Sequence, residues 1–323
     1  MKAAESGRRE WGLAELVSRY GIVISFLVLF LILSFLSNNF LTSNNLVNVL
    51  RQVSINGVLA VGMTFVILTA GIDLSIGSIL ALAGAVAASL VTGGDAQPAV
   101  FAVIAGVLVG AACGVINGGL IAYFSVPPFV ATLGLLSVAR GATLLYSGGR
   151  PIPNLSPEFR WLGQGAVLGI PVPVIIFAIV FAIAYVTLRY SVYGRRVYAV
   201  GGNPRSAKTS GINTRGIVFS VYALMGGLAG LAGVMLTART TSALPQAGIG
   251  YELDAIAAVV IGGTSLTGGI GRITYTLVGV LIIGMISNGL DLMGVSSYYQ
   301  QIIKGSIIVL AVLIDRSKDR GEL

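Results

Sequence analysis

Residues 55–78 read INGVLAVGMTFVILTAGIDLSIGS, and this stretch decides the fold class. An apolar run ends near Gly71, a carboxylate follows at Asp73, and a second apolar run starts at Ser78. A membrane-spanning helix needs about 20 mostly apolar residues to cross about 30 Å of hydrocarbon. The stretch therefore predicts a membrane helix, a polar break and the start of another helix.

The composition of the whole chain is that of a membrane protein. Of its 323 residues, 55% are hydrophobic and 10% are charged, against about 25% charged in soluble domains. The chain has no histidine and one cysteine, Cys113, which excludes His-based triads and internal disulfides. None of its four lysines follows a glycine, so a phosphate-binding loop of the ATPase type is absent. We expect no catalytic residues, no metal and no cofactor, and therefore a transport protein rather than an enzyme.

An all-α protein with about ten transmembrane helices is the predicted fold, and an even number of crossings puts both termini on one side. The first stretch is too long for a cleaved signal peptide, so we treat it as a retained span. The candidate spans are Val17–Leu36, Val53–Ala70, Ser78–Val91, Ala99–Phe124, Phe129–Leu145, Pro173–Leu188, Ile217–Leu236, Ala255–Ile273, Thr274–Ser287 and Tyr298–Ile314.

The distribution of basic residues predicts the orientation, because short loops rich in Lys and Arg stay in the cytoplasm. Fourteen of the 20 Lys and Arg residues lie in the head, the loop 189–215 or the tail, or at Arg19 or Arg272, against three on the opposite side. We therefore expect a cytoplasmic head (1–16), one polytopic permease domain (17–315) with a cytoplasmic loop (189–215), and a cytoplasmic tail (316–323).

Two regions are typical of discontinuous membrane helices, which often line a transport path between structural repeats. One is the break at Asp73, where the carboxylate either caps the following helix or lies beside a polar solute. The other starts at Glu252 and Asp254, continues as a nine-residue apolar run, and ends in the glycine-rich segment 264–272. The amides inside apolar stretches, Asn56, Asn117 and Asn288, bind either the solute or a neighbouring helix. The expected path or gate residues are Asn56, Asp73, Ser75, Asn117, Glu252, Asp254, Thr264 and Ser265.

Glycine ridges mark two of the predicted spans. One contains glycines at strict four-residue spacing and the other at similar spacing, which lets helix backbones approach closely. Static packing of the bundle and sliding during a transport cycle both fit this pattern. The ridges are Gly106, Gly110, Gly114 and Gly118, and Gly226, Gly230 and Gly233.

The loop 201–213 carries the signals of a short helix. Asn203 is a good N-cap, Pro204 suits the first helical position, and Gly211 can adopt the left-handed conformation after the last turn. These signals predict a helix of about seven residues. Such a helix can transmit force from a docked partner, whereas the alternative is a solvated basic turn.

The chain resembles the membrane permease subunits of ABC importers for sugars such as ribose. The similarity is densest in residues 55–78, 201–213, 242–265 and 294–300. It implies a type II, vitamin B12 importer-like architecture and a homodimer embedded in the lipid of the bacterial inner membrane. It also implies two partners, a cytoplasmic ABC ATPase and a periplasmic sugar-binding protein, and no nucleic acid. It also implies a coupling helix that docks on the ATPase, with the residues Asn203, Pro204, Arg205, Ser206, Ala207, Lys208 and Gly211.

The resemblance implies import of ribose or a similar sugar by alternating access. Importer coupling segments often show an acidic residue, two alanines and a later glycine, but here only Ala207 and Gly211 keep that spacing. An ion-coupled secondary transporter working alone is the alternative, although the lack of histidine and the few membrane acids argue against it. An intramembrane enzyme is disfavoured because no nucleophile, base and metal set can be assembled.

Overall fold

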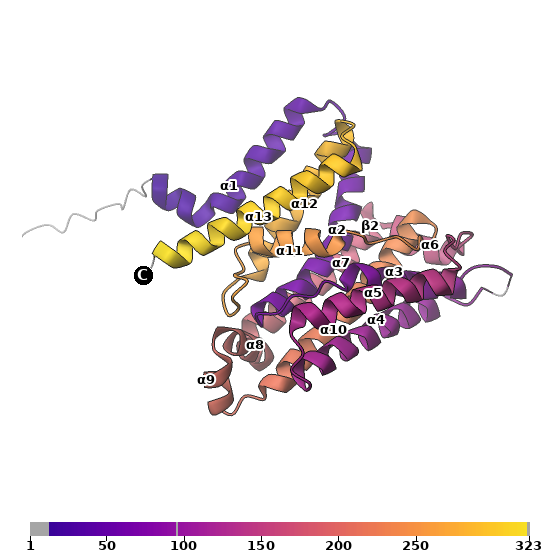
Figure 1. Ribbon diagram of the computed structural model, residues 1–323. Coiled ribbons are helices and arrows are strands. Elements are labelled where there is room, and N and C mark those ends of the chain that lie inside the picture. The colour runs from indigo at the N-terminus through magenta and orange to yellow at the C-terminus, as the bar shows by residue number, and fades with distance from the viewer. Residues whose placement is uncertain (1–12, 95, 322–323) are drawn as a thin grey trace, which may run out of the picture.

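The computed structural model describes residues 13–94 and 96–321, which form a bundle of helices with one small hairpin (Figure 1). The strands β1 (Ala166–Val167) and β2 (Ile170–Pro171) pair antiparallel. The helices are α1 (Leu13–Leu36), α2 (Ser43–Leu68), α3 (Ile76–Leu90), α4 (Ala99–Ala122), α5 (Pro128–Ser147), α6 (Pro157–Gln164), α7 (Val172–Tyr190), α8 (Val192–Gly202), α9 (Pro204–Thr209), α10 (Thr214–Thr240), α11 (Tyr251–Ile261), α12 (Ile273–Leu292) and α13 (Ser297–Gly321).

Six of the described helices are long and apolar enough to cross a membrane: α2, α4, α5, α7, α10 and α12. In the most apolar 18-residue part of α2, 83% of the residues are buried, whereas the share is 28% in α4, α5 and α7. Helix α2 is therefore central, and the outer helices expose apolar side chains as lipid-facing helices do. This arrangement supports a multi-pass membrane protein.

The predicted span from Ala255 to Ile273 is wrong as a continuous helix. Helix α11 ends at Ile261, and a loop follows until α12 begins at Ile273. The loop contains Gly263, Gly268 and Gly269 at positive φ (77°, 87° and 71°), a backbone conformation that helices do not use. The glycines therefore end one helix rather than kink a single span. Helix α12 is longer than predicted, mainly because it continues past Ser287 to Leu292.

Parts of the predicted head and tail lie outside the described residues. Residues 1–12 of the head (1–16) and residues 322–323 of the tail (316–323) are not described. Helix α13 continues past Ile314, the predicted end of the last span, to Gly321.

The two glycine ridges pack against each other, one on α4 and the other on α10. A Cβ added to Gly110 would overlap the carbonyl oxygen of Gly226, and one added to Gly114 would overlap that of Tyr222. The expected close approach of backbones is therefore confirmed. Because Cα and carbonyl atoms fill the interface, this helix pair tolerates no side chain at these positions.

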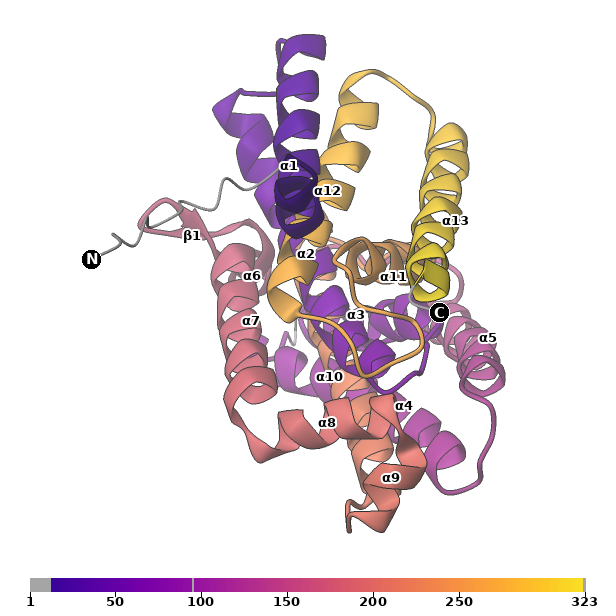
Figure 2. The same cartoon turned by 90° about the vertical axis from the view of Figure 1, so that its left-hand side faces the viewer.

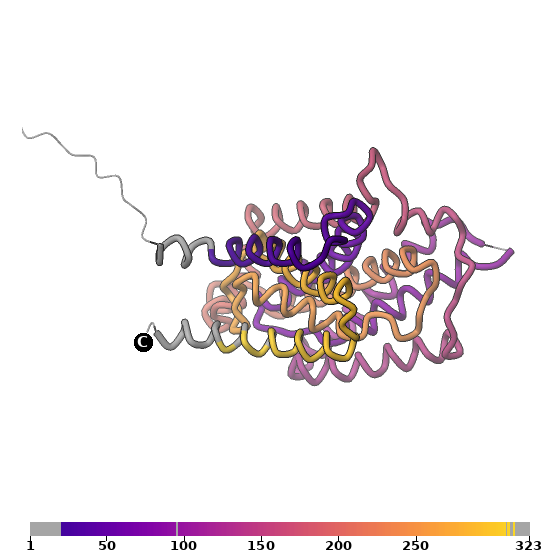
Figure 3. Tube along the Cα trace, turned by 90° about the horizontal axis from the view of Figure 1, so that it is seen from above, coloured from indigo at the N-terminus to yellow at the C-terminus, as the bar shows by residue number. Residues whose placement is uncertain are grey.

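The bundle has two distinct ends. Helices α8 and α9 lie toward the same end as the beginning of α1 and the end of α13 (Figure 1). Helix α6 and the hairpin lie toward the other end (Figures 1 and 3). Figure 2 looks toward the first end, with α8 and α9 at the bottom of the view. The basic loop 189–215 and the end of α13 therefore share one side of the bundle.

Candidate functional site

A buried polar cluster occupies the break between α2 and α3. The backbone N–H and the hydroxyl of Ser75 both donate to Asp73 Oδ1, at 2.9 and 2.5 Å. Asn117 of α4 donates from Nδ2 to Ser75 Oγ at 3.0 Å. All three side chains are completely buried. Asp73 Oδ2 and Asn117 Oδ1 have no hydrogen-bond partner among the described residues, so the cluster retains two acceptors for a further donor.

Of the two alternatives for Asp73, a helix cap or a place beside a polar solute, the first is met only indirectly, because the N-cap position lies two residues later. Helix α3 begins at Ile76 and Ser75 is its N-cap residue. Asp73 instead accepts from the residue two positions on, which is an Asx-turn. The carboxylate thus orders the entry into α3 without being its cap.

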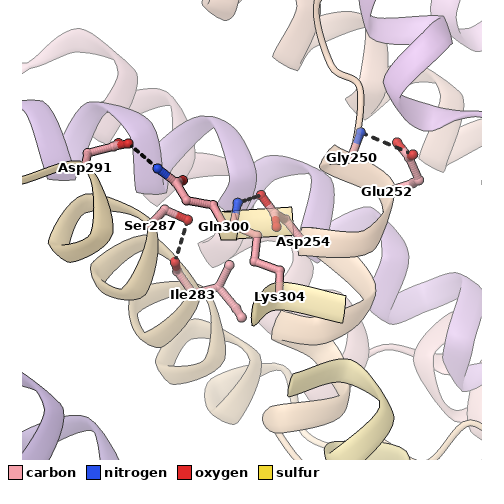
Figure 4. Close-up of polar contacts among 8 residues, drawn as sticks. All are labelled: Gly250, Glu252, Asp254, Ile283, Ser287, Asp291, Gln300 and Lys304. Atoms are coloured by element: carbon pink, nitrogen blue, oxygen red, sulfur yellow. Dashed lines mark hydrogen bonds and ion pairs between the residues drawn. The ribbon is translucent and has the colours of Figure 1, made fainter. Parts of the chain in front are cut away.

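The N-terminal ends of α3 and α11 meet face to face. A Cβ on Gly77 of α3 would overlap the carbonyl oxygen of Gly248 and would lie 2.6 Å from Glu252 Oε2. Glu252 Oε1 accepts from Gly250 N–H at 3.3 Å (Figure 4). Two short helices therefore point their positive ends at one region, and the Glu252 carboxylate lies between them.

Arg140 of α5 fixes the segment that leads into α11. Its Nη1 donates to the carbonyl oxygens of Pro245 and Ala247, at 2.7 and 2.9 Å. It also attracts the Glu252 carboxylate electrostatically. Arg140 thus ties an outer helix to the junction of α3 and α11.

Asp254 lies on α11 but is bound to α13 rather than to the α3 junction. Its Oδ2 pairs with Lys304 Nζ at 2.9 Å, and the Asp254 side chain is 7% exposed (Figure 4). Nearby, Gln300 donates to Asp291 Oδ1 at 2.8 Å and holds the start of α13 against the end of α12. The Asp254–Lys304 pair therefore fixes α11 against the last helix.

Thr264 and Ser265 lie in the loop after α11, beside the end of α2. Gly269 in this loop donates its N–H to the Leu68 carbonyl at 3.0 Å. Gly201 of α8 packs on both groups: an added Cβ would lie 2.7 Å from Gly269 N and closer still to Leu68 O. Three segments, α2, α8 and this loop, therefore meet backbone to backbone.

Helix α9 is the short helix that the sequence predicts. The Asn203 side chain accepts from Ser206 N–H at 3.0 Å, Pro204 is the first helical residue, and Gly211 has a φ of 82°. The helix has six residues rather than about seven. Ala207 is its buried residue, and Arg205 and Lys208 are exposed. Helix α9 follows α8 after a single residue, so the two are directly linked.

The amides expected inside the membrane differ in their environment. Asn288 of α12 and Asn45 of α2 exchange two hydrogen bonds, at 2.8 and 3.0 Å, so Asn288 joins two helices. Asn56 is buried on α2, and its Oδ1 has no hydrogen-bond partner among the described residues. It lies in the middle of α2, well before the break that follows this helix.

The structure thus brings together only part of the expected set. Asp73, Ser75 and Asn117 form one cluster, Glu252 lies at the α3–α11 junction, and the other expected residues lie elsewhere. Sequence reasoning missed the roles of Arg140, Lys304 and Tyr222. Arg140 and Lys304 carry a signal, since each is a charged residue in or beside an apolar stretch. Tyr222 carries none: its hydroxyl donates to the Ile72 carbonyl at 3.4 Å, a contact that depends on the packing of α10.

Comparison with known proteins gives a consistent result. The family model described as "Branched-chain amino acid transport system / permease component" matches residues 45–312. The ribose import permease protein RbsC of Escherichia coli strain K12 is 52% identical over 97% of this chain and 98% of its own length. The protein of the same name from Bacillus subtilis strain 168 is 50% identical over 94% of each chain. The D-allose transport system permease protein AlsC of E. coli K12 is 42% identical over 98% of this chain and 97% of its own. No solved structure matches.

Proposed function

The chain belongs to the family of permease components of branched-chain amino acid transport systems, and on this premise we propose that it is the membrane subunit of an ABC importer for ribose or a similar sugar. The observation that carries the proposal is the 52% identity to a ribose import permease over nearly the whole of both chains. The stand-alone, ion-coupled transporter is not favoured by these relatives.

The assembly that we propose has two copies of this subunit, a cytoplasmic ATPase and a sugar-binding protein outside the inner membrane. Both termini and the α8–α9 segment face the cytoplasm, in agreement with the concentration of basic residues there. The chain then crosses the membrane about ten times, with α3 and α11 as short, discontinuous elements in a type II architecture. The permease domain is 17–315.

Helix α9 is the proposed coupling helix that receives the movement of the ATPase. Its residues Asn203 to Lys208 and the following Gly211 are the proposed contacts. The contact of α8 with α2 and the loop after α11 supports this role, because the backbones of Gly201, Leu68 and Gly269 touch with no space between them. A displacement of α9 then reaches both the end of α2 and the loop that holds Thr264 and Ser265.

The proposed sugar path passes the junction of α3 and α11. Asp73, Ser75 and Asn117 lie on one side of this junction and Glu252 on the other, and the partnerless acceptors of the cluster suit sugar hydroxyl donors. Asn56, Asp254, Thr264 and Ser265 belong to the proposed gate around the path. Alternating access follows if ATP binding and release favour different positions of α9.

Complementation tests the function and the coupling assignment together. Cells that lack their own ribose permease and express this chain should take up labelled ribose in preference to allose. Replacing Ala207 and Gly211 by leucine should abolish uptake, because Ala207 is buried and Gly211 has positive φ, so that leucine disturbs α9 and the turn after it. The amount of membrane-inserted protein should stay unchanged. Leucine at Gly134, which has open space around it, is the control. Normal uptake in the Ala207 and Gly211 variant would refute the coupling assignment.

A further inference from the structure

A basic cleft of about 630 Å³ lies where the end of α7 meets α8 and the start of α12. Arg189, Arg195 and Arg272 line it, together with Tyr185 and Tyr198. Among residues 21–94 and 96–307, whose side chains the structure describes, no acidic side chain lines the cleft and none forms an ion pair with the three arginines. The fold therefore brings three like charges from three segments to one cavity without a counter-charge from those residues.

The surroundings of the cleft reinforce its positive potential. Helix α12 begins at Ile273, so the positive end of its dipole lies at the cleft wall. Tyr198 holds the neighbouring loop in place by donating to the Gly271 carbonyl at 3.0 Å. Burial raises the pKa of the Tyr198 phenol, and Arg272 and Arg189 oppose that rise, which places both charges near its ring.

The cleft opens beside a surface that faces lipid. Arg189 lies in the last turn of α7, and Val186 and Ile183, one and two turns before it, are 54% and 62% exposed. Residues three apart on a helix share a face, so Val186 lies directly beneath Arg189 on the membrane side. The rings of Tyr185 and Tyr190 pack 6.1 Å apart, and such tyrosines are typical of the membrane–water boundary.

We propose that this cleft binds the phosphate group of an anionic phospholipid from the leaflet on the α9 side. Guanidinium groups bind phosphate oxygens through paired, charge-assisted hydrogen bonds. Basic pockets between membrane helices at the boundary suit anionic headgroups. The acyl chains would then lie along the exposed apolar face of α7. That this leaflet is the cytoplasmic one rests on the orientation given under the proposed function, whereas lipid binding itself does not depend on transport.

Because α8 leads into α9 and contacts the loop after α11, a lipid held here would also fix the segment through which coupling is proposed. Bound lipid is therefore expected to stabilise α8 against the start of α12. The consequence is a permease whose thermal stability in detergent increases with added anionic lipid.

The test uses the purified full-length chain and short-chain lipids. Binding of dioctanoyl phosphatidylglycerol, dioctanoyl phosphatidylcholine and inorganic phosphate is measured by microscale thermophoresis and by thermal unfolding. The variant Arg189→Gln/Arg195→Gln/Arg272→Gln is compared with Arg150→Gln/Arg160→Gln/Arg196→Gln. The control removes the same charge from exposed arginines that do not line the cleft, and Arg196 is the direct neighbour of Arg195.

Saturable binding of phosphatidylglycerol is expected, weakened by about tenfold or more in the cleft variant because several charge-assisted hydrogen bonds are lost. The control variant should stay within about twofold of the parent, because its three arginines do not line the cleft and cannot form those hydrogen bonds. If the cleft variant does not purify, Arg195→Gln against Arg196→Gln gives the same comparison, with a loss of about threefold expected at Arg195 only.

Four results would overturn the proposal. An equal loss of phosphatidylglycerol binding in the cleft and control variants would mean non-specific electrostatic attraction. Equally tight binding of phosphatidylcholine and phosphatidylglycerol would mean that the cleft does not recognise the negative charge of the lipid. Inorganic phosphate that binds as tightly as phosphatidylglycerol would identify a soluble anion instead. Loss of assembly with the ATPase subunit, with lipid binding unchanged, would identify the cleft as a protein contact.

Discussion

The contact between α8 and the end of α2 leaves no room for a side chain at Gly201. A Cβ there would overlap the Leu68 carbonyl oxygen and would lie 2.7 Å from Gly269 N, and these are the two groups of the 3.0 Å hydrogen bond that joins α2 to the loop after α11. Gly201→Ala must therefore separate α8 from α2 or break that bond. Backbone atoms meet the new methyl group, so no side-chain rotation can relieve the clash.

The expected cost has two parts. Overpacking costs about 1–3 kcal/mol, and an N–H of Gly269 left unpaired costs about 1–3 kcal/mol more. Gly202→Ala is the matched control, because the nearest atom to its Cβ would be 4.0 Å away, at Gly269 Cα. Alanine also favours a helix over glycine by up to about 1 kcal/mol, so the control should be neutral or slightly more stable than the parent.

Thermal unfolding of the purified chain measures the cost, and sugar-stimulated ATP hydrolysis by the assembled complex measures the consequence. Gly201→Ala should lower both, while Gly202→Ala should leave both near the parent values. If the two variants behave alike, then the backbone contact at Gly201 neither stabilises the subunit nor transmits movement from α9.

Two further substitutions test the packing of the bundle. Lys304→Met leaves the buried Asp254 carboxylate without its 2.9 Å partner and should lower the free energy of unfolding by about 3–5 kcal/mol, measured by thermal unfolding. Adding Asp254→Asn should recover part of this loss. An equal loss in the single and the double variant would contradict the pairing. Gly114→Ala makes a methyl group overlap the Tyr222 carbonyl oxygen of α10 and should cost about 1–3 kcal/mol, whereas Gly119→Ala, with nothing within 4 Å, should not. A harmless Gly114→Ala would mean that the α4–α10 interface is looser than described.

Much of the fold could be predicted because it depends on local sequence. The apolar stretches, the glycine ridges and the cap at Asn203 all act within a helix or its first turn, so each carries its signal in a few neighbouring residues. The exception is the loop after α11. A glycine-rich run there is compatible with either a kinked span or the end of a helix. In the structure Gly263 has a positive φ, and α11 ends before it.

The candidate site was less predictable because it depends on distant contacts. Asn117 meets Ser75 because α4 packs directly on α3, and Lys304 meets Asp254 because α13 returns along α11. The periodicity of apolar residues and the spacing of motifs along the sequence contain no information on which helices become neighbours. The charge of Lys304 in an apolar stretch could have predicted a buried partner, but not which of the acidic residues it would be.

Transport by purified components tests the central claim most directly. The chain is reconstituted in liposomes with its ATPase subunit and a ribose-binding protein, and in parallel without either, under an imposed proton or sodium gradient. We predict that labelled ribose accumulates against its gradient only in the complete system and only with ATP. Accumulation driven by the ion gradient in liposomes that contain this chain alone would contradict the account.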